Sequence, residues 1–444
     1  MKKKLFLLAI VFGVCGKICA GGLLTNTNQN VSFLRNPARG ASTEIDAAYT
    51  NPAGLAFLTH EGLSFSINNQ SAFQTRTLTT TFAPFAGFGG NATKDFEGKA
   101  TAWVIPSLQA AYKTGDWVFS GNFSVAGGGG TLEFASGLPS FESQVSMIPL
   151  KVNQSVGATA FDGYSLESRL KGSSITFGGQ LGATYSILDN FSAYLGLRLN
   201  YVNNSYEGYL KNIQLRSANG GTYIPVQNID PTLGDMNLDL KQTGMGIAPV
   251  IGLDYKWNNL NVGVVYEFKS AIELNNKTKE NTTGQAQFDD GFKTPYDIPA
   301  LLSVGAQYDI LPALTVSAGY HHFFDSDAKM LNDRQKLING GTNEYLAGVE
   351  YRFNPKFLAS GGVQFTRSAV TDAFQSDLNY FLNSVSFGFG GAWNVTENIR
   401  INAAYFFTNY EDWTTETPVI ATVKGSTVFG RTNKTFGIGV DFKF

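Results

Sequence analysis

Residues 435–444 read T-F-G-I-G-V-D-F-K-F, and this stretch decides the fold. Side chains alternate between the two faces of a β-strand. Here every second residue is large and apolar, and the residues between them are polar or small. One face therefore suits lipid, and the other suits water or a plug. A soluble sandwich could use the same pattern in an edge strand, so the rest of the chain must separate the two folds.

The N-terminus has the pattern of a secretory signal peptide. A lysine-rich start precedes an apolar run, Leu5–Val14, which is too short to cross a bilayer as a helix. Small residues at 20–22 offer a cleavage zone, so we assign residues 1–20 to the signal peptide. Both cysteines, Cys15 and Cys19, lie in this segment. Valine and isoleucine precede them, which disfavours a lipid anchor. Export would then leave no thiol for a disulfide or a thiolate metal site.

The alternating pattern recurs along the chain and predicts an all-β protein. Residues 190–201, 259–268, 344–353 and 399–408 match the strand period and not the helical one. Mean hydropathy is close to zero, as expected when lipid-facing and lumen-facing residues average out. No later run is apolar and long enough for a membrane helix. Lysines and arginines are scattered, so nothing indicates nucleic-acid binding.

Short turns and long loops alternate between these strands. Six short turns are rich in Gly, Asn, Asp and Pro, and seven loops are long. Short turns on one side and long loops on the other are typical of outer-membrane barrels, and together they join about 14 strands. The fold class we expect is thus an antiparallel transmembrane β-barrel of residues 61–444. The short turns are near 113–116, 188–190, 256–259, 309–312, 354–356 and 394–398; the long loops are near 74–99, 128–170, 208–238, 273–296, 325–342, 368–381 and 411–431.

Residues 21–60 differ from the rest because they lack sustained alternation. They carry two Asn-Pro-Ala triplets, at 36–38 and 51–53. The segment is short for a separate domain. A barrel of this size has a lumen that side chains alone do not fill. We therefore expect residues 21–60 to fold inside the barrel as a plug, or hatch.

These features resemble the FadL/TodX-type transporters of Gram-negative outer membranes, which carry long-chain fatty acids and hydrocarbons. The resemblance spans the exported chain. Its specific part is the hatch motif Asn51, Pro52, Ala53 and Gly54, just before the first strand. Family members typically have adjacent acidic residues upstream, whereas this chain has the separated pair Glu44 and Asp46.

The resemblance implies a passive mechanism. Outer loops would capture a hydrophobic ligand, and a lumen pocket beside the plug and the N-terminus would receive it. A plug shift would then release it through an opening in the barrel wall, where the third strand is kinked. Water-filled pores give such solutes no favourable environment. The partners implied are this ligand, outer-membrane lipids and lipopolysaccharide, with no ATP, cofactor or covalent chemistry.

Glycines mark the place where the wall could open. The third strand is expected at Trp117–Ala126, with Gly121 interrupting its outward face and a glycine run after its end. Glycine in a strand often accompanies a bulge or bend. A flexible loop start is the alternative reading. The residues predicted to shape the lateral opening are Gly121, Gly127, Gly128, Gly129 and Gly130.

Candidate ligand-binding residues divide into apolar and cationic groups. The family pattern would place Leu23 and Leu24, at the start of the exported chain, in the pocket. An arginine could bind a ligand carboxylate through two parallel hydrogen bonds, and the candidates are Arg198, Arg352 and Arg400. The alternative is that these arginines pair with acidic groups of the barrel and plug. His321 and His322 have no companion ligands at suitable spacing, so we predict no metal site.

Other classes of function remain as alternatives. A secretion-associated barrel of the same type would bind a protein partner with its loops. A general porin is disfavoured because the plug would block water flow. No Ser-His-Asp set is apparent among three histidines, so we expect no enzyme activity. A closed barrel leaves no free strand edges, and a monomer is the expectation.

Overall fold

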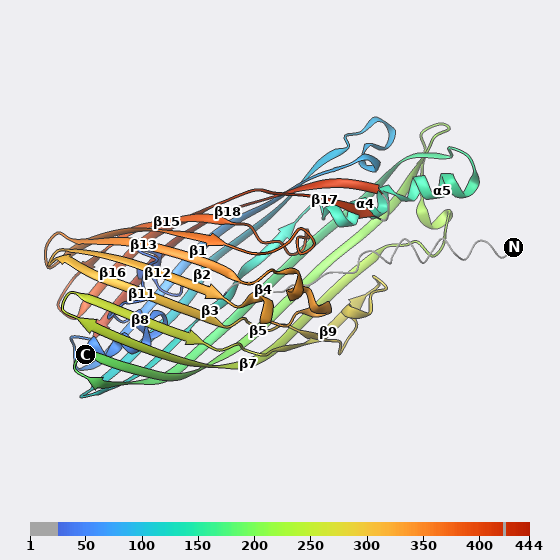
Figure 1. Cartoon of the computed structure of the whole chain (residues 1–444). Coiled ribbons are helices and arrows are strands. Elements are labelled where there is room, and N and C mark those ends of the chain that lie inside the picture. Colours follow the sequence, from blue (N-terminus) through green and yellow to red (C-terminus); the bar gives the residue numbers. More distant parts are fainter. Residues whose placement is uncertain (1–24, 421–422) are drawn as a thin grey trace.

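The computed structural model describes residues 25–420 and 423–444, and Figure 1 shows the whole chain. The predicted signal peptide, together with Leu23 and Leu24, lies outside the described residues. Among these residues, all strands belong to one antiparallel sheet of 18 strands. Setting aside four short strands that extend or pair with others (β6, β9, β10 and β17) leaves a closed barrel of 14. The predicted barrel is therefore confirmed.

The strands of the barrel run in sequence order around the wall. The last strand returns to the first, and residues 64–82 pair with residues 425–443. The barrel strands are β1 (Gly62–Phe82), β2 (Thr93–Thr114), β3 (Trp117–Phe134), β4 (Phe161–Leu188), β5 (Phe191–Ser217), β7 (Met236–Trp257), β8 (Leu260–Glu267), β11 (Leu301–Leu311), β12 (Leu314–Phe323), β13 (Thr342–Arg352), β14 (Phe357–Arg367), β15 (Ser384–Asn394), β16 (Ile399–Tyr410) and β18 (Val423–Lys443).

The remaining elements are short. The four further strands are β6 (Tyr223–Pro225), β9 (Glu273–Asn281), β10 (Lys293–Pro295) and β17 (Trp413–Ile420). The helices are α2 (Val31–Arg35), α3 (Ala47–Thr50), α4 (Pro139–Ser146) and α5 (Ile148–Val156), with 3₁₀ turns η1 (Pro52–Phe57), η2 (Ala83–Gly89), η3 (Val226–Asn228), η4 (Ala286–Phe288), η5 (Asp325–Asp327) and η6 (Leu331–Leu337). None of the described helices is long and apolar enough to cross a membrane.

The barrel wall is apolar on its outer face and polar on its inner face, the reverse of a soluble protein. Leucines and isoleucines project outward, with Leu181 74% and Leu195 68% exposed, whereas inward-facing Gln109 and Gln180 are buried. A soluble protein would bury the first group and expose the second. Exposed aromatic residues also gather beside the short turns, where a membrane interface would lie. They include Trp117, Tyr185, Trp257, Tyr351 and Trp393.

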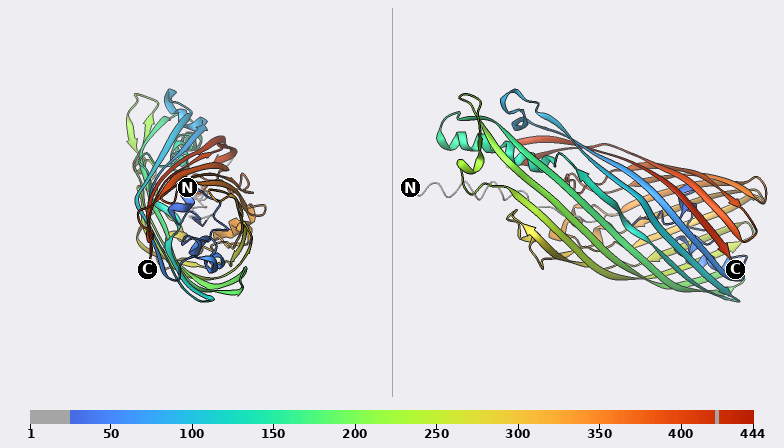
Figure 2. Two further views of the ribbon diagram at one scale, coloured as in Figure 1. Left: turned by 90° about the vertical axis from the view of Figure 1, so that its left-hand side faces the viewer. Right: turned by 180° about the vertical axis from the view of Figure 1, so that it is seen from behind.

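Strand length differs sharply around the wall. β4 and β5 have 28 and 27 residues, whereas β11–β16 have 10 to 12. About 9–11 residues suffice to cross a bilayer. The long strands therefore rise beyond the rest on one side, and Figures 1 and 2 show this taller wall with α4 and α5 at its end.

The long strands correct several predicted loops. The six short turns fall where they were predicted. The loop predicted at 74–99 shrinks to 83–92, and the one at 128–170 shrinks to 135–160, because β1–β4 continue into them. Much of 411–431 is the hairpin of β17 and β18. The glycine run was expected after the third strand, but it lies inside β3.

The helices α2, α3 and η1 lie inside the barrel, as the end-on view of Figure 2 shows. Every residue of α2 is buried, including Arg35. α2 packs against β15, β16 and β18, and η1 packs against β4, β5 and β7. Residues 25–60 therefore occupy the lumen toward the short-turn end, where the C-terminus also lies.

Candidate functional site

The ladder between β2 and β3 is interrupted in the middle of the wall. Thr101 pairs with Thr131 and Ser107 pairs with Ser124, but residues 102–106 and 125–130 have no partners across this seam. The neighbouring seams are also irregular there, with shifts between Gln70 and Ala72 of β1 and two shifts in the β3–β4 ladder. Trp103 is 69% exposed on the outside of this stretch. We call residues 102–106 and 125–130 the wall gap.

Two glycines of β3 allow the backbone to take this path. Gly128 and Gly130 have φ of +79° and +101°, a region that other residues rarely adopt. A Cβ on Gly128 would lie 1.9 Å from the carbonyl oxygen of Ser174. Gly127 and Gly129 also lie in this part of β3, whereas Gly121 sits in a regular ladder between Ala110 and Leu181. Only Gly121 of the five predicted glycines is thus outside the gap.

The start of the plug covers the gap from inside. The backbone N–H of Asn26 donates to the carbonyl oxygen of Ala126 at 2.8 Å. Its side-chain amide donates to the carbonyl of Gly128 at 2.9 Å. Gln29 accepts hydrogen bonds from the side chains of Asn122, at 2.9 Å, and Ser124. The N-terminal segment, residues 25–29, thus satisfies carbonyls of β3 that β2 leaves unpaired.

A cavity of about 420 Å³ lies against this segment inside the barrel. Its lining joins the N-terminal segment, gap residues such as Ile105 and Gly128, and the loop at 377–382. This volume is in the range of small-molecule sites. Its surface mixes polar groups, among them those of the N-terminal segment, with apolar groups. The apolar ones include Leu132, Phe134, Leu170, Phe381 and Leu382.

The hatch motif fastens the plug to the barrel. Asn51 is fully buried, and its side-chain amide donates to the carbonyl of Ser42 at 3.0 Å and to Asp254 of β7. Thr184 donates to the carbonyl of Pro52 at 2.7 Å, and Ser192 donates to that of Ala53 at 2.8 Å. A Cβ on Gly54 would lie 2.5 Å from the carbonyl oxygen of Ser42. The motif is therefore a docking segment between plug and wall.

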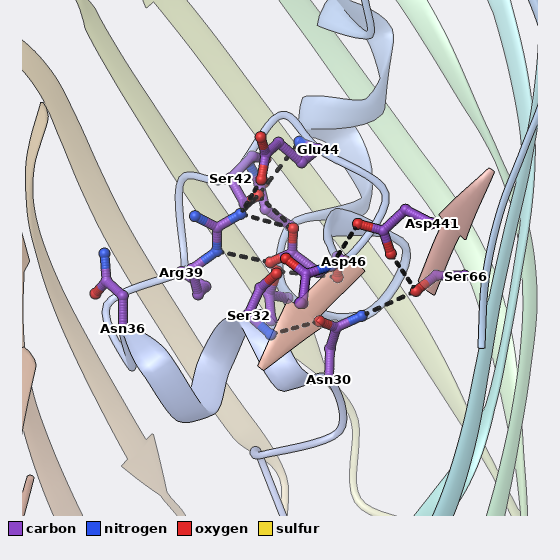
Figure 3. Close-up of polar contacts among 12 residues, drawn as sticks. Asn30, Ser32, Asn36, Arg39, Ser42, Glu44, Asp46, Ser66 and Asp441 are labelled. Carbon is purple, nitrogen blue, oxygen red and sulfur yellow. Dashed lines mark hydrogen bonds and ion pairs between the residues drawn. The ribbon is translucent and has the colours of Figure 1, made fainter. Parts of the chain in front are cut away.

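A charge cluster holds the rest of the plug, and Figure 3 shows its centre at Arg39. Arg39 binds Asp46 with nitrogen–oxygen distances of 2.7 and 2.8 Å, and it also contacts Glu44 at 3.0 Å. Burial alone would raise the pKa of Glu44, but Arg400, Arg39 and Arg35 hold this pKa well below its ordinary value. Arg35 in turn pairs with Glu350 of β13. Ion pairs thus join the plug to β13 and β16.

The three arginines proposed for ligand binding lie outside the cavity lining. Arg198 is buried against Glu267 at 3.1 Å, with its guanidinium 4.5 Å from the Tyr49 ring. Arg400 pairs with Glu44 at 2.6 Å. Arg352 is exposed at the end of β13. These contacts favour the alternative stated from the sequence, in which Arg198 and Arg400 pair with acidic groups of the barrel and plug.

The cavity lining instead includes two other arginines, Arg76 and Arg431, which were not among the predicted site residues. Both fall in stretches that were predicted to be loops, at 74–99 and 411–431. The alternation of Gln74, Arg76 and Leu78 continues that of β1 and could have extended the strand.

The histidine pair has protein partners. His321 Nδ1 lies 2.9 Å from Glu344, and His322 Nδ1 lies 2.9 Å from Asn343. Over the described ranges, no three His, Cys, Asp or Glu side chains gather as a metal site would require.

Comparison with known proteins identifies the fold. No protein-family model matches the sequence, and no curated protein matches it either. Among solved structures, a Pseudomonas aeruginosa FadL homologue matches with a TM-score of 0.66 and 13% identity, over 96% of this chain and 100% of that one. The Pseudomonas putida toluene transporter TodX matches with a TM-score of 0.55 and 15% identity, over 90% and 94%. The Ralstonia pickettii toluene transporter TbuX matches with 0.56 and 15%, over 92% and 98%. The resemblance stated from the sequence is thereby confirmed at the level of architecture: this chain has the fold of the FadL/TodX-type barrels.

Proposed function

We propose that the protein is a passive outer-membrane uptake channel for hydrophobic solutes. The observation that carries this proposal is the cavity whose lining includes the outer loop at 377–382, the N-terminal segment and the wall gap. A solute captured by the loop at 377–382 would pass directly into the cavity, because this loop forms part of its lining. It would then pass through the wall into lipid, where an apolar molecule is more stable than in water.

Release requires the N-terminal segment to move, because it covers the gap. Three hydrogen bonds from Asn26 and those to Gln29 hold the segment on β3. Each such bond contributes about 1 kcal/mol net, so detaching the segment from β3 costs on the order of a few kcal/mol. Gln70 of β1 and Gln109 of β2 also bind the segment, through Asn28 and Gln29. The rest of the plug would stay in place on its ion pairs and on the hatch motif.

A reversible staple across the gap tests this route. A Cβ on Gly130 would lie 3.2 Å from the Ala102 Cβ, close to the separation in a disulfide. The chain has no cysteine beyond residue 19, so the variant Ala102→Cys/Gly130→Cys carries a single engineered pair. We expect the oxidised form to bind a fluorescent long-chain fatty acid and to lose its uptake in cells. Reduction should restore uptake in the same preparation.

The single variants Ala102→Cys and Gly130→Cys control for strain, since a residue at position 130 must adopt a positive φ. Equal uptake by the oxidised and reduced double variant would exclude the wall gap as the exit. A wild-type barrel that binds neither fatty acids nor aromatic probes would instead contradict hydrophobic uptake as a whole. Native mass spectrometry of protein purified in mild detergent would show whether a lipid copurifies.

A further inference from the structure

A second stretch of the wall lacks backbone pairing, on the side of β7 that faces away from β5. There β8 pairs with β7 up to Val250, and β9 resumes the ladder at Thr243. Between these points the Phe268 N–H donates to the carbonyl of Pro249. Residues 244–248 of β7 have no backbone partner on this side in the part of the chain that the structure describes. We call residues 244–248 the second gap.

The outer face of the second gap is apolar and suits lipid. Met245 and Ile247 project outward and are 61% and 60% exposed. About 9–11 tilted residues cross the hydrocarbon, and counting from Trp257 at the short-turn end places Ile247 at the far edge of the apolar band. Lipid offers no hydrogen bonds, so unpaired strand backbone is costly at this depth and is tolerated where protein covers it. The second gap therefore requires a cover.

Residues 269–274, which lead from β8 into β9, cover the second gap, and we call them the crossing segment. A Cβ on Gly244 or on Gly246 would lie 2.6 Å from a carbonyl oxygen of this segment. Both glycines point toward the lumen, because they alternate with the outward residues of the gap. In the regular ladder of the same strand, a Cβ on Gly252 would have no neighbour closer than 3.5 Å. The crossing segment thus lies on the inner surface of β7, at a distance that only glycine allows.

The cavity lies behind the crossing segment. Ile272 and Leu274 of this segment are buried in one cluster with Val202 and Tyr296. The backbone N–H of Tyr296 donates to the carbonyl of Ile272 at 2.9 Å, and Tyr296 also lines the cavity. The crossing segment and Tyr296 thus separate the lipid-facing second gap from the cavity.

Outer loops hold the crossing segment in place, and Asp297 is the centre of these contacts. Its carboxylate accepts from the backbone N–H groups of Ile272, at 3.2 Å, and of Lys329, at 3.1 Å. It also pairs with Lys269 at 3.1 Å. These contacts join the loop before β11 to the loop between β12 and β13, whereas the wall gap is covered by the N-terminal segment of the plug. The second gap can therefore open without a movement of the plug.

We propose that the second gap is a lateral entry port for apolar solutes already dissolved in the outer leaflet of the membrane. This inference rests on the proposed uptake function and adds a second source of solute to it. An apolar molecule in lipid would have to return to water to reach the loop at 377–382, and this transfer is unfavourable. A port at the edge of the hydrocarbon admits the molecule to the cavity directly. The wall gap remains the exit.

A reversible staple across the second gap tests the port. The Ser270 hydroxyl oxygen lies 2.6 Å from the position of a Cβ on Gly246, so the two Cβ atoms lie within the roughly 4 Å span of a disulfide. The variant Gly246→Cys/Ser270→Cys is reconstituted in vesicles whose bilayer contains a photoreactive hydrocarbon. After illumination, mass spectrometry measures the label on Tyr296 and on the lipid-facing Leu195. We expect oxidation to lower the Tyr296 label about tenfold and leave that of Leu195 unchanged, and reduction to restore it.

A second variant tests the cover without a disulfide. In Gly246→Ala, the added Cβ should push the crossing segment away from β7 and raise the Tyr296 label above that of wild type. Gly252→Ala is the matched control, because a Cβ fits at this position of the same strand. It should keep the wild-type label. Heat-dependent gel mobility verifies that each variant forms the barrel.

The staple Ala102→Cys/Gly130→Cys separates entry from exit. In its oxidised form it should keep the Tyr296 label, although it blocks uptake in cells. Equal Tyr296 labels in the oxidised and reduced forms of Gly246→Cys/Ser270→Cys would overturn the port and leave the proposed uptake intact. A wild-type barrel without label on Tyr296 that still binds a fatty acid or an aromatic probe would have the same meaning. A wild-type barrel that shows neither would overturn both the port and the uptake function.

Discussion

At the scale of single residues, Asn51 links the plug to a buried carboxylate of the wall. Its amide binds Asp254 and the Ser42 carbonyl, and Asn261 gives Asp254 a second donor at 3.1 Å. Replacing Asn51 with Ala removes one donor from each of these buried acceptors. Each loss costs about 1–3 kcal/mol. The barrel ladders do not depend on this side chain, so the effect should be confined to the plug.

We therefore expect Asn51→Ala to raise hydrogen exchange at residues 42–57 by about tenfold or more, and to leave the β1–β18 seam protected. Uptake should fall as the plug loosens. Asn36→Ala is the matched comparison, because Asn36 belongs to the other Asn-Pro-Ala triplet. Its side-chain amide donates to the Ser317 hydroxyl at 3.1 Å and its side-chain oxygen accepts from the Ala38 N–H, so it has no contact with a buried carboxylate of the wall. Its effect should be smaller. Loss of protection in the seam as well would make Asn51 a residue required for barrel folding.

Asp325, in the loop between β12 and β13, makes part of the structure sensitive to pH. Burial raises its pKa to about 7; the Thr342 hydrogen bonds oppose this shift, and Glu344 adds to it. The folded loop thus favours the protonated acid. Stability is fully present below the unfolded pKa near 4 and is lost as pH rises through about 7, by at most about 1.4 kcal/mol for each pH unit.

Hydrogen exchange of the Thr342 amide, which donates to Asp325 at 2.8 Å, measures this loss. After correction for intrinsic exchange, protection in wild type should fall between pH 5 and pH 8. Asp325→Asn should keep the same protection at both values, since it cannot ionise. Asp333→Asn is the control, because Asp333 pairs with Lys336 on the surface of the same loop. A wild-type profile that does not change with pH would refute the assignment.

At the scale of elements, the N-terminal segment acts as part of the wall. Asn26 supplies both a backbone and a side-chain donor to β3 at the gap. Asn26→Asp would place a carboxylate against the Gly128 carbonyl and repel it. We expect faster hydrogen exchange at residues 125–130 and a higher rate of solute release.

The comparison variant is Asn28→Asp, because the Asn28 amide donates only to the Gln70 side chain, at 3.2 Å. It should leave exchange in β3 near the wild-type rate. Equal exchange in Asn26→Asp and wild type would mean that the segment does not hold the gap closed.

Glycines on the inner face of the strands also act at this scale. A Cβ on Gly348 would lie 1.9 Å from Asn36 Oδ1, and one on Gly437 would lie 2.6 Å from the Leu34 side chain. Both glycines occupy the polar or small face of an alternating strand. The alternation predicts which way they point. The reason that only glycine fits at these two positions is the close approach of the plug, and this approach is visible only in the folded structure.

At the scale of the whole molecule, the pairing of β1 with β18 closes the sheet into a barrel. The barrel wall is taller on one side than on the other. The number of strands and the six short turns were predictable, because alternation and turn chemistry are local. The lengths of β1 to β5 were not predictable. Where these strands extend beyond the bilayer, their outward residues are polar, and a polar stretch in the sequence resembles a loop. This error hid Arg76 and Arg431. The monomeric state and the protein-partner alternative stay predictions.

The sequence alone determined the closed barrel with its apolar outer face, and it predicted a separate segment that carries the hatch motif. These follow from period-two patterning and from residue types that fix local backbone. The wall gap, the residues that cover it and the contents of the cavity were decided by tertiary structure. Each depends on strands far apart in the chain: β1 meets β18, and residues 25–29 meet β3. The register between distant strands and the docking of the N-terminal segment on β3 arise from long-range packing, which local sequence patterns do not specify.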